Sequence, residues 1–204
     1  MSRHKASRKP GQLRIIGGQW RGRRIDLLPD AGVRPTGDRV RETLFNWLAP
    51  VIDGARCLDL FAGSGALGLE ALSRGAGEAV FFERDTAACE RIEAVIETFG
   101  CETASVTCGD AVRFLRGGVK PRGFDIVFVD PPFGVMSLSN LCTLIDAGWL
   151  AVGARIYVET SRHDDPPNWP PGWVMERDKT AGQVRYRLFR LTGAGAKSDE
   201  RAGE

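Results

Sequence analysis

The sequence predicts a doubly wound α/β fold, and three observations support this prediction. From about residue 56 onward, short apolar runs alternate with segments of helical periodicity. The apolar runs are continuous, as in parallel strands whose two faces are both covered by helices. A chain of 204 residues also suits a single well-buried core.

The elements follow in a regular order. We expect strands at residues 56–60, 79–83, 104–108, 124–129 and 155–159, and helices at 66–73, 86–99, 111–115 and 138–147. Two last strands, 174–178 and 184–191, flank Ala181-Gly182 and should form a hairpin. This hairpin predicts an antiparallel strand near one edge of the sheet.

The first part of the chain should form a smaller unit. The stretches 13–16 and 23–27 flank a Gly-rich turn and predict a β-hairpin, and a helix should run from Thr36 or Asp38, either of which could cap it, to Leu48. We therefore expect a disordered basic tail at 1–11, a hairpin lobe at 12–30, the main domain at 31–192 and a disordered tail at 193–204.

Charge, cysteine spacing and apolar runs indicate which partners, metal sites and cellular location to expect. The net charge of +2 does not by itself indicate a nucleic-acid partner, but the cations between Arg3 and Arg24 precede the first acidic residue, Asp26, and predict a phosphate-contacting arm. The five cysteines form no CxxC pair and indicate reduced structural thiols, so we expect no metal. No apolar stretch has the length of a signal peptide or a membrane span, which predicts a cytoplasmic protein.

A glycine-rich loop carries the first functional signal. Residues 59–68 follow a strand and open a helix, with glycines at 63, 65 and 68. Such a loop lets the backbone approach a ligand while the helix start offers free N–H groups. The spacing also fits a dinucleotide fingerprint. Asp59 separates the two interpretations, because a carboxylate there would attract a cationic amine and repel a pyrophosphate.

Two further carboxylates follow the next strands. Glu83 ends one strand, where it can accept hydrogen bonds from both ribose hydroxyls, and Asp110 follows the next, beside the expected adenine. An amine, a ribose and an adenine together describe S-adenosylmethionine. Alternatively, the glycines serve only a tight turn, and Glu83 and Asp110 are capping or solvated carboxylates.

The tetrapeptide Asp130-Pro131-Pro132-Phe133 carries the predicted chemistry. An exocyclic base nitrogen is a poor nucleophile, and the Asp130 carboxylate and Pro131 carbonyl could accept its two N–H bonds and turn its lone pair toward the methyl group. The prolines fix φ, and Phe133 offers a face for the extruded base. The alternative is an ordinary turn with Phe133 covering the core. A carbon-directed enzyme would need a thiolate at this edge, and the sequence places none there.

Two longer stretches narrow the match to a family. Residues 15–22 (IIGGQWRG) and 34–46 (RPTGDRVRETLFN), with 181–184 (AGQV) and the two motifs above, resemble the RsmD family of bacterial 16S ribosomal RNA methyltransferases. The resemblance covers about residues 13–191. It implies a Rossmann-like class I methyltransferase that modifies N2 of a guanine in 16S rRNA, within a small-subunit assembly particle. Separately, we expect the protein to be a monomer.

The expected site residues fall into two groups. The predicted cofactor contacts are Asp59, Phe61, Ala62, Gly63, Ser64, Gly65, Gly68, Glu83, Arg84, Asp110, Ala111 and Arg39, the last pairing with the cofactor's carboxylate. The predicted RNA contacts are Arg21, Arg23, Arg34 and Arg41. Alternatively, the arginines at 34–41 line a solvated helix face with Glu42 as local partner. Trp20 and Trp47 should pack in the core or the lobe.

Two other functions stay open at this point. The same tetrapeptide could serve an adenine-N6 methyltransferase acting on DNA or RNA. A non-catalytic RNA-binding assembly protein could also retain the fold, although the intact glycines and Asp130 motif argue against it.

Overall fold

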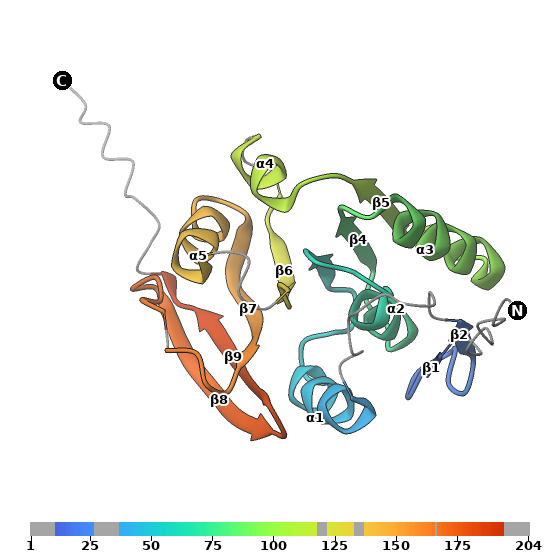
Figure 1. Ribbon diagram of the computed structural model, residues 1–204, viewed down its shortest axis with the longest axis horizontal. Coiled ribbons are helices and arrows are strands. Elements are labelled where there is room, and N and C mark those ends of the chain that lie inside the picture. The colour runs from blue at the N-terminus through green and yellow to red at the C-terminus, as the bar shows by residue number, and fades with distance from the viewer. Residues whose placement is uncertain (1–10, 27–36, 118–121, 133–136, 166, 194–204) are drawn as a thin grey trace, which may run out of the picture.

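The computed structural model describes residues 11–26, 37–117, 122–132, 137–165 and 167–193. Its main feature is a seven-stranded sheet of order β5-β4-β3-β6-β7-β9-β8, with a separate two-stranded hairpin (Figure 1). The sheet strands are β3 (Arg56–Asp59), β4 (Glu78–Glu83), β5 (Ala104–Cys108), β6 (Phe124–Val129), β7 (Leu150–Ser161), β8 (Trp173–Ala181) and β9 (Val184–Leu191). The hairpin consists of β1 (Gln12–Arg14) and β2 (Arg24–Asp26).

The strands β5, β4, β3, β6 and β7 pair in parallel, whereas β9 is antiparallel to both of its neighbours. The predicted antiparallel strand near one edge is therefore confirmed, and it lies second from that edge. The turn between β8 and β9 contains Gly182 with φ of 59°, a left-handed conformation that glycine adopts at little cost.

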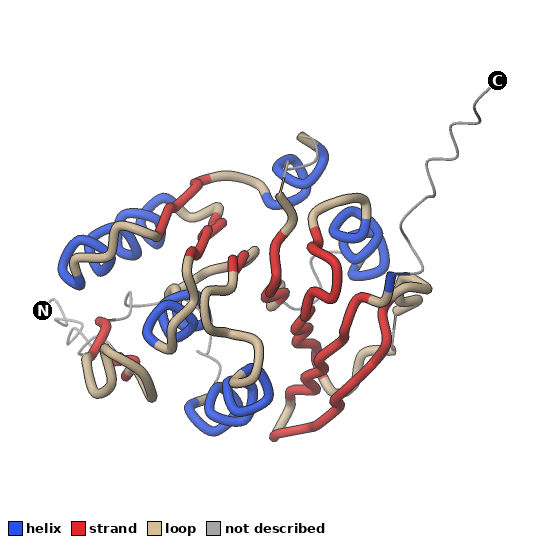
Figure 2. The backbone as a smooth tube through the Cα atoms, turned by 180° about the vertical axis from the view of Figure 1, so that it is seen from behind, coloured by secondary structure: helices blue, strands red, loops and turns tan. Residues whose placement is uncertain are grey.

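Helices cover both faces, as Figure 2 also shows from behind. They are α1 (Asp38–Leu48), α2 (Ala66–Ser73), α3 (Thr86–Phe99), α4 (Ala111–Arg116) and α5 (Leu138–Asp146). One buried cluster joins residues of α1, α2 and α3 to Phe81 and Phe128, and the other joins α4 and α5 to Val127 and Val158. Successive strand residues point to opposite faces of the sheet, and each face is covered by its own helices. Helices on both faces of a mostly parallel sheet are the doubly wound arrangement that the sequence predicts.

The β1–β2 hairpin packs against the core of the rest of the molecule. Leu13, Ile15, Trp20 and Ile25 belong to the same buried cluster as α1 and α2. Trp20 also contacts Phe99 of α3, with ring centroids 4.9 Å apart, which confirms that it packs between the lobe and the core. Domain boundaries at 12–30 and 31–192 stay predictions.

Element boundaries differ from expectation in two instructive places. The strand expected at 155–159 runs over twelve residues, because it continues past a register irregularity opposite Phe124 and Ile126. Helix α1 begins at Asp38 with Gly37 as its N-cap and no side-chain capping bond. Asp38 therefore does not cap; its carboxylate pairs with Arg41, and Thr36 lies outside the described residues.

The five cysteines are free thiols, and Cys57, Cys89 and Cys142 are buried. Cys142 lies on α5 and packs in the buried cluster between this helix and the sheet, as a small hydrophobic residue would. Trp47 stacks on Tyr186, with ring centroids 5.5 Å apart. Among the described helices, none is both long and apolar enough to cross a membrane.

Candidate active site

The carboxyl ends of β3, β4, β5 and β6 meet at one edge of the sheet, because these strands are parallel. This edge is where ligands bind in open α/β sheets. It brings together Asp59, the glycine loop, Glu83, Asp110 and Asp130, all of which the sequence singles out. The tips of β3 and β6 are direct neighbours, since Asp59 pairs with Phe128.

The glycine loop needs glycine at two positions. Gly63 has φ of 51°, and Gly65, the N-cap of α2, has φ of 74°. A Cβ on Gly65 would also lie 3.1 Å from Leu69 Cδ1 and 3.2 Å from Ile92 Cγ1. Other residues would be strained in this conformation, so the turn into α2 depends on these glycines.

Asp59 is a buried carboxylate beneath this loop. Its side chain is 2% exposed, and Oδ2 accepts a hydrogen bond of 2.9 Å from Gly68 N. Burial raises the pKa of Asp59 to about 7; the Gly68 N–H opposes this shift, and the nearby Glu83 carboxylate adds to it. A cation placed against Asp59 would offset this cost, so the position suits a positively charged ligand.

Glu83 ties the tip of β4 to the glycine loop. Its Oε2 accepts from Gly63 N at 2.8 Å, and its Oε1 accepts from Arg84 N at 2.8 Å and Asp85 N at 2.9 Å. The carboxylate is thereby fixed in one orientation. Because two carboxylate oxygens offer about four acceptor sites, the side chain keeps capacity for ribose hydroxyls.

The expected adenine-side residues lie at the next strand tip. Asp110 is the N-cap of α4, and its Oδ1 accepts from Arg113 N at 2.9 Å. The capping interpretation is thus observed for this residue, although its exposed side chain stays open to a ligand. Ala111 is buried at the start of α4, and Arg84 is exposed.

Gly68 is a correction to the predicted cofactor contacts. It is buried on α2, where a Cβ would come within 2.3 Å of the Phe81 ring. Its N–H is taken by Asp59. Gly68 therefore lets α2 approach β4 closely and holds the Asp59 carboxylate, and it faces the protein interior.

The tetrapeptide that the sequence predicts to be catalytic begins where β6 ends. Asp130 and Pro131 are half-buried, Pro132 is exposed, and Phe133 lies outside the described residues. Asp130 follows the β6 residue Val129, whose pairing partner on β7 is Val158. The next residue of β7 is Glu159, a buried carboxylate at the same edge that was not among the predicted site residues. The strand-tip rule that selected Asp59 and Glu83 applies equally to Glu159.

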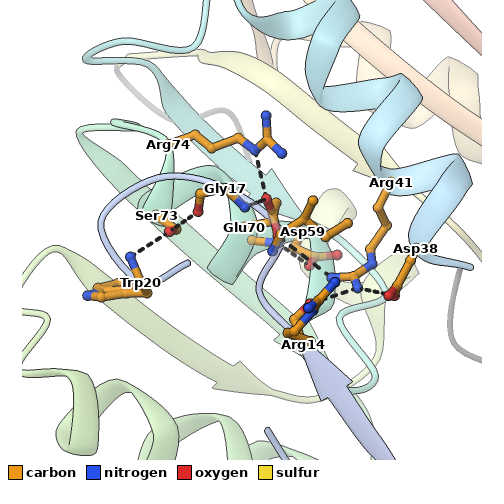
Figure 3. A network of polar contacts seen from close by, with 11 residues as sticks. Arg14, Gly17, Trp20, Asp38, Arg41, Asp59, Glu70, Ser73 and Arg74 are labelled. Carbon is orange, nitrogen blue, oxygen red and sulfur yellow. Dashed lines mark hydrogen bonds and ion pairs between the residues drawn. The ribbon is translucent and has the colours of Figure 1, made fainter. Parts of the chain in front are cut away.

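A second set of contacts, drawn in Figure 3, attaches the hairpin to α2. The fully buried Glu70 carboxylate accepts from Ile16 N and Gly17 N, both at 2.8 Å, and from Arg74 Nε at 2.7 Å. Ser73 Oγ accepts from Trp20 N at 3.0 Å. The motif at residues 15–22 is therefore held by the end of α2 opposite the glycine loop. Helical periodicity gave no sign of this role for Glu70.

Arg41 is a second correction. It was predicted to contact phosphates, but its side chain is fully buried. Arg41 donates to Arg14 O at 2.9 Å and to Asp38 Oδ1 at 2.7 Å, and lies 3.7 Å from Glu70 (Figure 3). An arginine enclosed in this way cannot reach RNA. The alternative of a solvated helix face fails at this position for the same reason.

The other predicted arginines differ in their placement. Arg21, Arg23 and Arg39 are exposed, and the Arg23 guanidinium lies 4.7 Å from the Phe99 ring centroid. Arg34 lies outside the described residues. Within the described part of the chain, no cluster of His, Cys, Asp and Glu side chains is arranged to hold a metal ion.

Comparison with known proteins identifies the family. The family described as "Conserved hypothetical protein 95" matches residues 13–190. The ribosomal RNA small subunit methyltransferase D of Escherichia coli K12 is 50% identical over 186 residues, which are 91% of this chain and 93% of that protein. The Haemophilus influenzae protein of the same name is 45% identical over 88% of this chain and 94% of its own length. The chain belongs to the RsmD family.

Solved structures related to the RsmD family agree with the fold. A putative methyltransferase from Escherichia coli superposes with a TM-score of 0.81 at 50% identity, covering 89% of this chain and 99% of its own. A putative methylase from Haemophilus influenzae has a TM-score of 0.78 at 41% identity, with the same coverage. The resemblance stated from the motifs at 15–22 and 34–46 is confirmed.

Proposed function

We propose that this chain transfers a methyl group from S-adenosylmethionine to the exocyclic N2 of a guanine in 16S rRNA of the small ribosomal subunit. Membership of the RsmD family supports this activity, since its relatives are named ribosomal RNA small subunit methyltransferases. The observation that carries the proposal is the meeting of two half-sites at one sheet edge. Asp59, the glycine loop and Glu83 form one, and Asp130 with Pro131 forms the other.

The first half-site fits the proposed cofactor. Asp59 is buried, accepts a hydrogen bond from Gly68 N and has a raised pKa, so a positively charged ligand would compensate its burial. The left-handed glycines let the loop pass close to a nucleoside. Glu83 would bind the ribose and Asp110 would lie beside the adenine. The bound cofactor would supply a methyl group already activated by its positive sulfur.

The second half-site orients the nucleophile. The Asp130 carboxylate and the Pro131 carbonyl would accept the two N–H bonds of the base amine. This aligns the nitrogen lone pair with the methyl group, and alignment alone contributes a large share of catalysis in such transfers. Pro131 and Pro132 carry no N–H, so neither offers a competing donor. Phe133 would stack on the extruded base.

RNA binding would use the exposed arginines of the hairpin side. Arg21 and Arg23 would contact phosphates, together with Arg34, while Arg39 would pair with the cofactor's carboxylate. We propose that the substrate is an assembling small-subunit particle, that the enzyme acts as a monomer, and that it works in the cytoplasm where such particles form. The basic arm at residues 1–11 would add to phosphate contact.

The product nucleoside tests this proposal. Small-subunit particles lacking the modification would be incubated with the protein and methyl-labelled S-adenosylmethionine, and the RNA then digested to nucleosides. We expect label in N2-methylguanosine. Label in N6-methyladenosine would overturn the guanine assignment, and no transfer to RNA at all would support the non-catalytic alternative.

A further inference from the structure

The tips of β6 and β7 place two carboxylates side by side. The parallel register pairs Phe128 with Tyr157 and Val129 with Val158. Continued by one residue beyond the end of β6, this register places Asp130 beside Glu159. Figure 1 shows β6 and β7 as neighbours in the middle of the sheet. Glu159 therefore belongs to the edge at which the target base would be held.

Both carboxylates belong to the same face of the sheet. Phe128 and Tyr157 share the cluster under α1 and α2, with ring centroids 6.4 Å apart, whereas Val129 and Val158 belong to the opposite cluster. Side chains two positions apart on a strand share a face. Asp130 and Glu159 thus follow Phe128 and Tyr157 on the α1 side, just beyond the buried aromatic layer.

Tyr157 fixes the orientation of Glu159. The Tyr157 hydroxyl donates a hydrogen bond of 2.7 Å to Glu159 Oε2, and both residues are buried. Burial raises the pKa of Tyr157 well above its usual value, and the charges of Glu159 and Asp130 raise it further. The hydroxyl accordingly stays protonated and acts as a donor toward Glu159. A carboxylate offers about four acceptor sites, so neither this bond nor a second one exhausts them.

The two purines differ at the atom next to the reacting amine. Guanine carries N1–H beside its N2 amine, so this edge presents three N–H bonds and requires acceptors only. Adenine carries an N6 amine beside N1, which is a bare acceptor. Asp130 and Pro131 can take the two amine protons of either base. A second carboxylate beside them complements guanine and opposes the adenine N1 lone pair.

We infer that Glu159 is a specificity-determining residue that accepts the N1–H of the target guanine and rejects adenine, with Tyr157 as its positioning residue. This inference rests on the proposed function and assigns its base selectivity to one side chain. A polar group built to bond a substrate N–H discriminates strongly against an analogue that lacks it, because the lone pair of the analogue's N1 then faces the carboxylate and no hydrogen bond forms between them.

The test compares guanine with 2-aminopurine at the methylated position of the RNA. 2-Aminopurine keeps the 2-amino group but has no N1–H, so its N1 is an acceptor. We expect wild-type protein to methylate guanine with a kcat/KM about 100-fold or more above that for 2-aminopurine. In Glu159→Gln the amide can donate to N1. The kcat/KM for guanine should fall and that for 2-aminopurine should rise, so that the ratio of the two approaches one.

Two further variants serve as a control and as an independent test of the Glu159 role. Glu176→Gln on β8 removes a carboxylate that pairs with Arg155 and Arg190, far along the sheet order from β6, and should leave the ratio unchanged. Tyr157→Phe frees Glu159 from its bond and should lower the ratio about tenfold without altering cofactor affinity. If Glu159→Gln does not fold, the Tyr157→Phe ratio decides the matter.

The outcomes separate the inference from the proposed function. Equal losses on both bases in Glu159→Gln would show a purely structural role and overturn the inference, as would an unchanged ratio in Tyr157→Phe. In either case wild-type formation of N2-methylguanosine would leave the proposed function standing. Failure of wild type to methylate guanine at N2 would instead remove the proposed function itself.

Discussion

At the residue scale, Asp59 lies beneath the glycine loop, and its burial determines its pKa. Burial raises its pKa from 3.8 to about 7, so the folded protein binds the proton more tightly than the unfolded chain does. For an acid shifted in this direction, the contribution to stability is lost as pH rises from about 4 to 7. A cationic ligand reverses the preference, because it favours the ionised form.

This coupling predicts the pH dependence of cofactor binding. Affinity for S-adenosylmethionine should rise with pH up to about 7 and level off above it, since binding must release the Asp59 proton at lower pH. Calorimetric titration at pH 6 and pH 8, in buffers of different ionisation enthalpy, measures both the affinity and the released proton. Asp59→Asn should abolish the proton release. The same proton release in this variant would show that another group titrates.

Glu83 and Gly63 show how single residues are linked across the site. The Glu83 carboxylate holds Gly63 N, and Asp59 holds Gly68 N, so two strand-tip acids fix both ends of the turn into α2. The loop is therefore shaped by the same residues that are proposed to contact the cofactor. The sequence pattern predicts that these acids bind the cofactor, and the structure adds their role in positioning the loop.

At the element scale, α2 connects the glycine loop to the β1–β2 hairpin. Its first residues receive the glycine loop, and its last turn holds the hairpin through Glu70 and Ser73 (Figure 3). The helix has eight residues, and all are buried. Hairpin docking and loop geometry are thus set by one short, fully buried helix. Arg41 contributes a positive charge 3.7 Å from Glu70.

This arrangement predicts the effect of Glu70→Gln. An amide presents only one oxygen, so the Ile16 and Gly17 amides cannot both keep an acceptor; Arg74 loses the carboxylate it pairs with, and Arg41 loses one of its two, keeping Asp38. We expect a loss of about 3 kcal/mol in unfolding free energy, the cost of breaking a buried ion pair. Urea denaturation measures this loss, and hydrogen exchange at residues 15–20 should accelerate most.

The matched control is Glu42→Gln. Glu42 is exposed on α1, so its replacement should change stability by less than about 0.5 kcal/mol. If hydrogen exchange at residues 15–20 were unchanged in Glu70→Gln, the hairpin would not depend on this carboxylate for its attachment.

At the scale of the whole molecule, periodicity and turn signals were sufficient to predict the order of strands and helices, because each buried strand and each amphipathic helix satisfies its own local pattern. The site edge was predictable for a related reason. Parallel strands bring their carboxyl ends together, so Asp59, Glu83, Asp110 and Asp130 could be assigned to one place before any contact was known.

Tertiary contacts explain what the sequence could not predict. Arg41 has the same local context as an exposed arginine, and only the approach of Arg14 and Glu70 from other elements encloses it. Gly68 looks like part of a nucleotide loop until the Phe81 ring is placed against it. Asp38 could cap α1 by its residue type, but its carboxylate is taken by Arg41.

The distribution of exposed cations yields a prediction for RNA binding. Arg21 and Arg23 are exposed on the hairpin, so Arg21→Ala and Arg23→Ala should each weaken RNA binding and reduce the slope of log affinity against log salt by about 0.7 to 0.9. Filter binding from low to moderate salt measures the slope. Arg177→Ala, on the exposed side of β8, should leave it unchanged. Equal slopes in all three variants would exclude the hairpin from phosphate contact.

The central claim is that the tip of β6 aligns an exocyclic base amine for methyl transfer, and Asp130→Ala tests it most directly. Single-turnover methylation of small-subunit particles should slow by about 100-fold, since one of the two acceptors that orient the amine is lost. Cofactor affinity, measured on the same preparation, should stay within about twofold of wild type, because Asp130 is not among the proposed cofactor contacts. An unchanged single-turnover rate in Asp130→Ala would contradict the account.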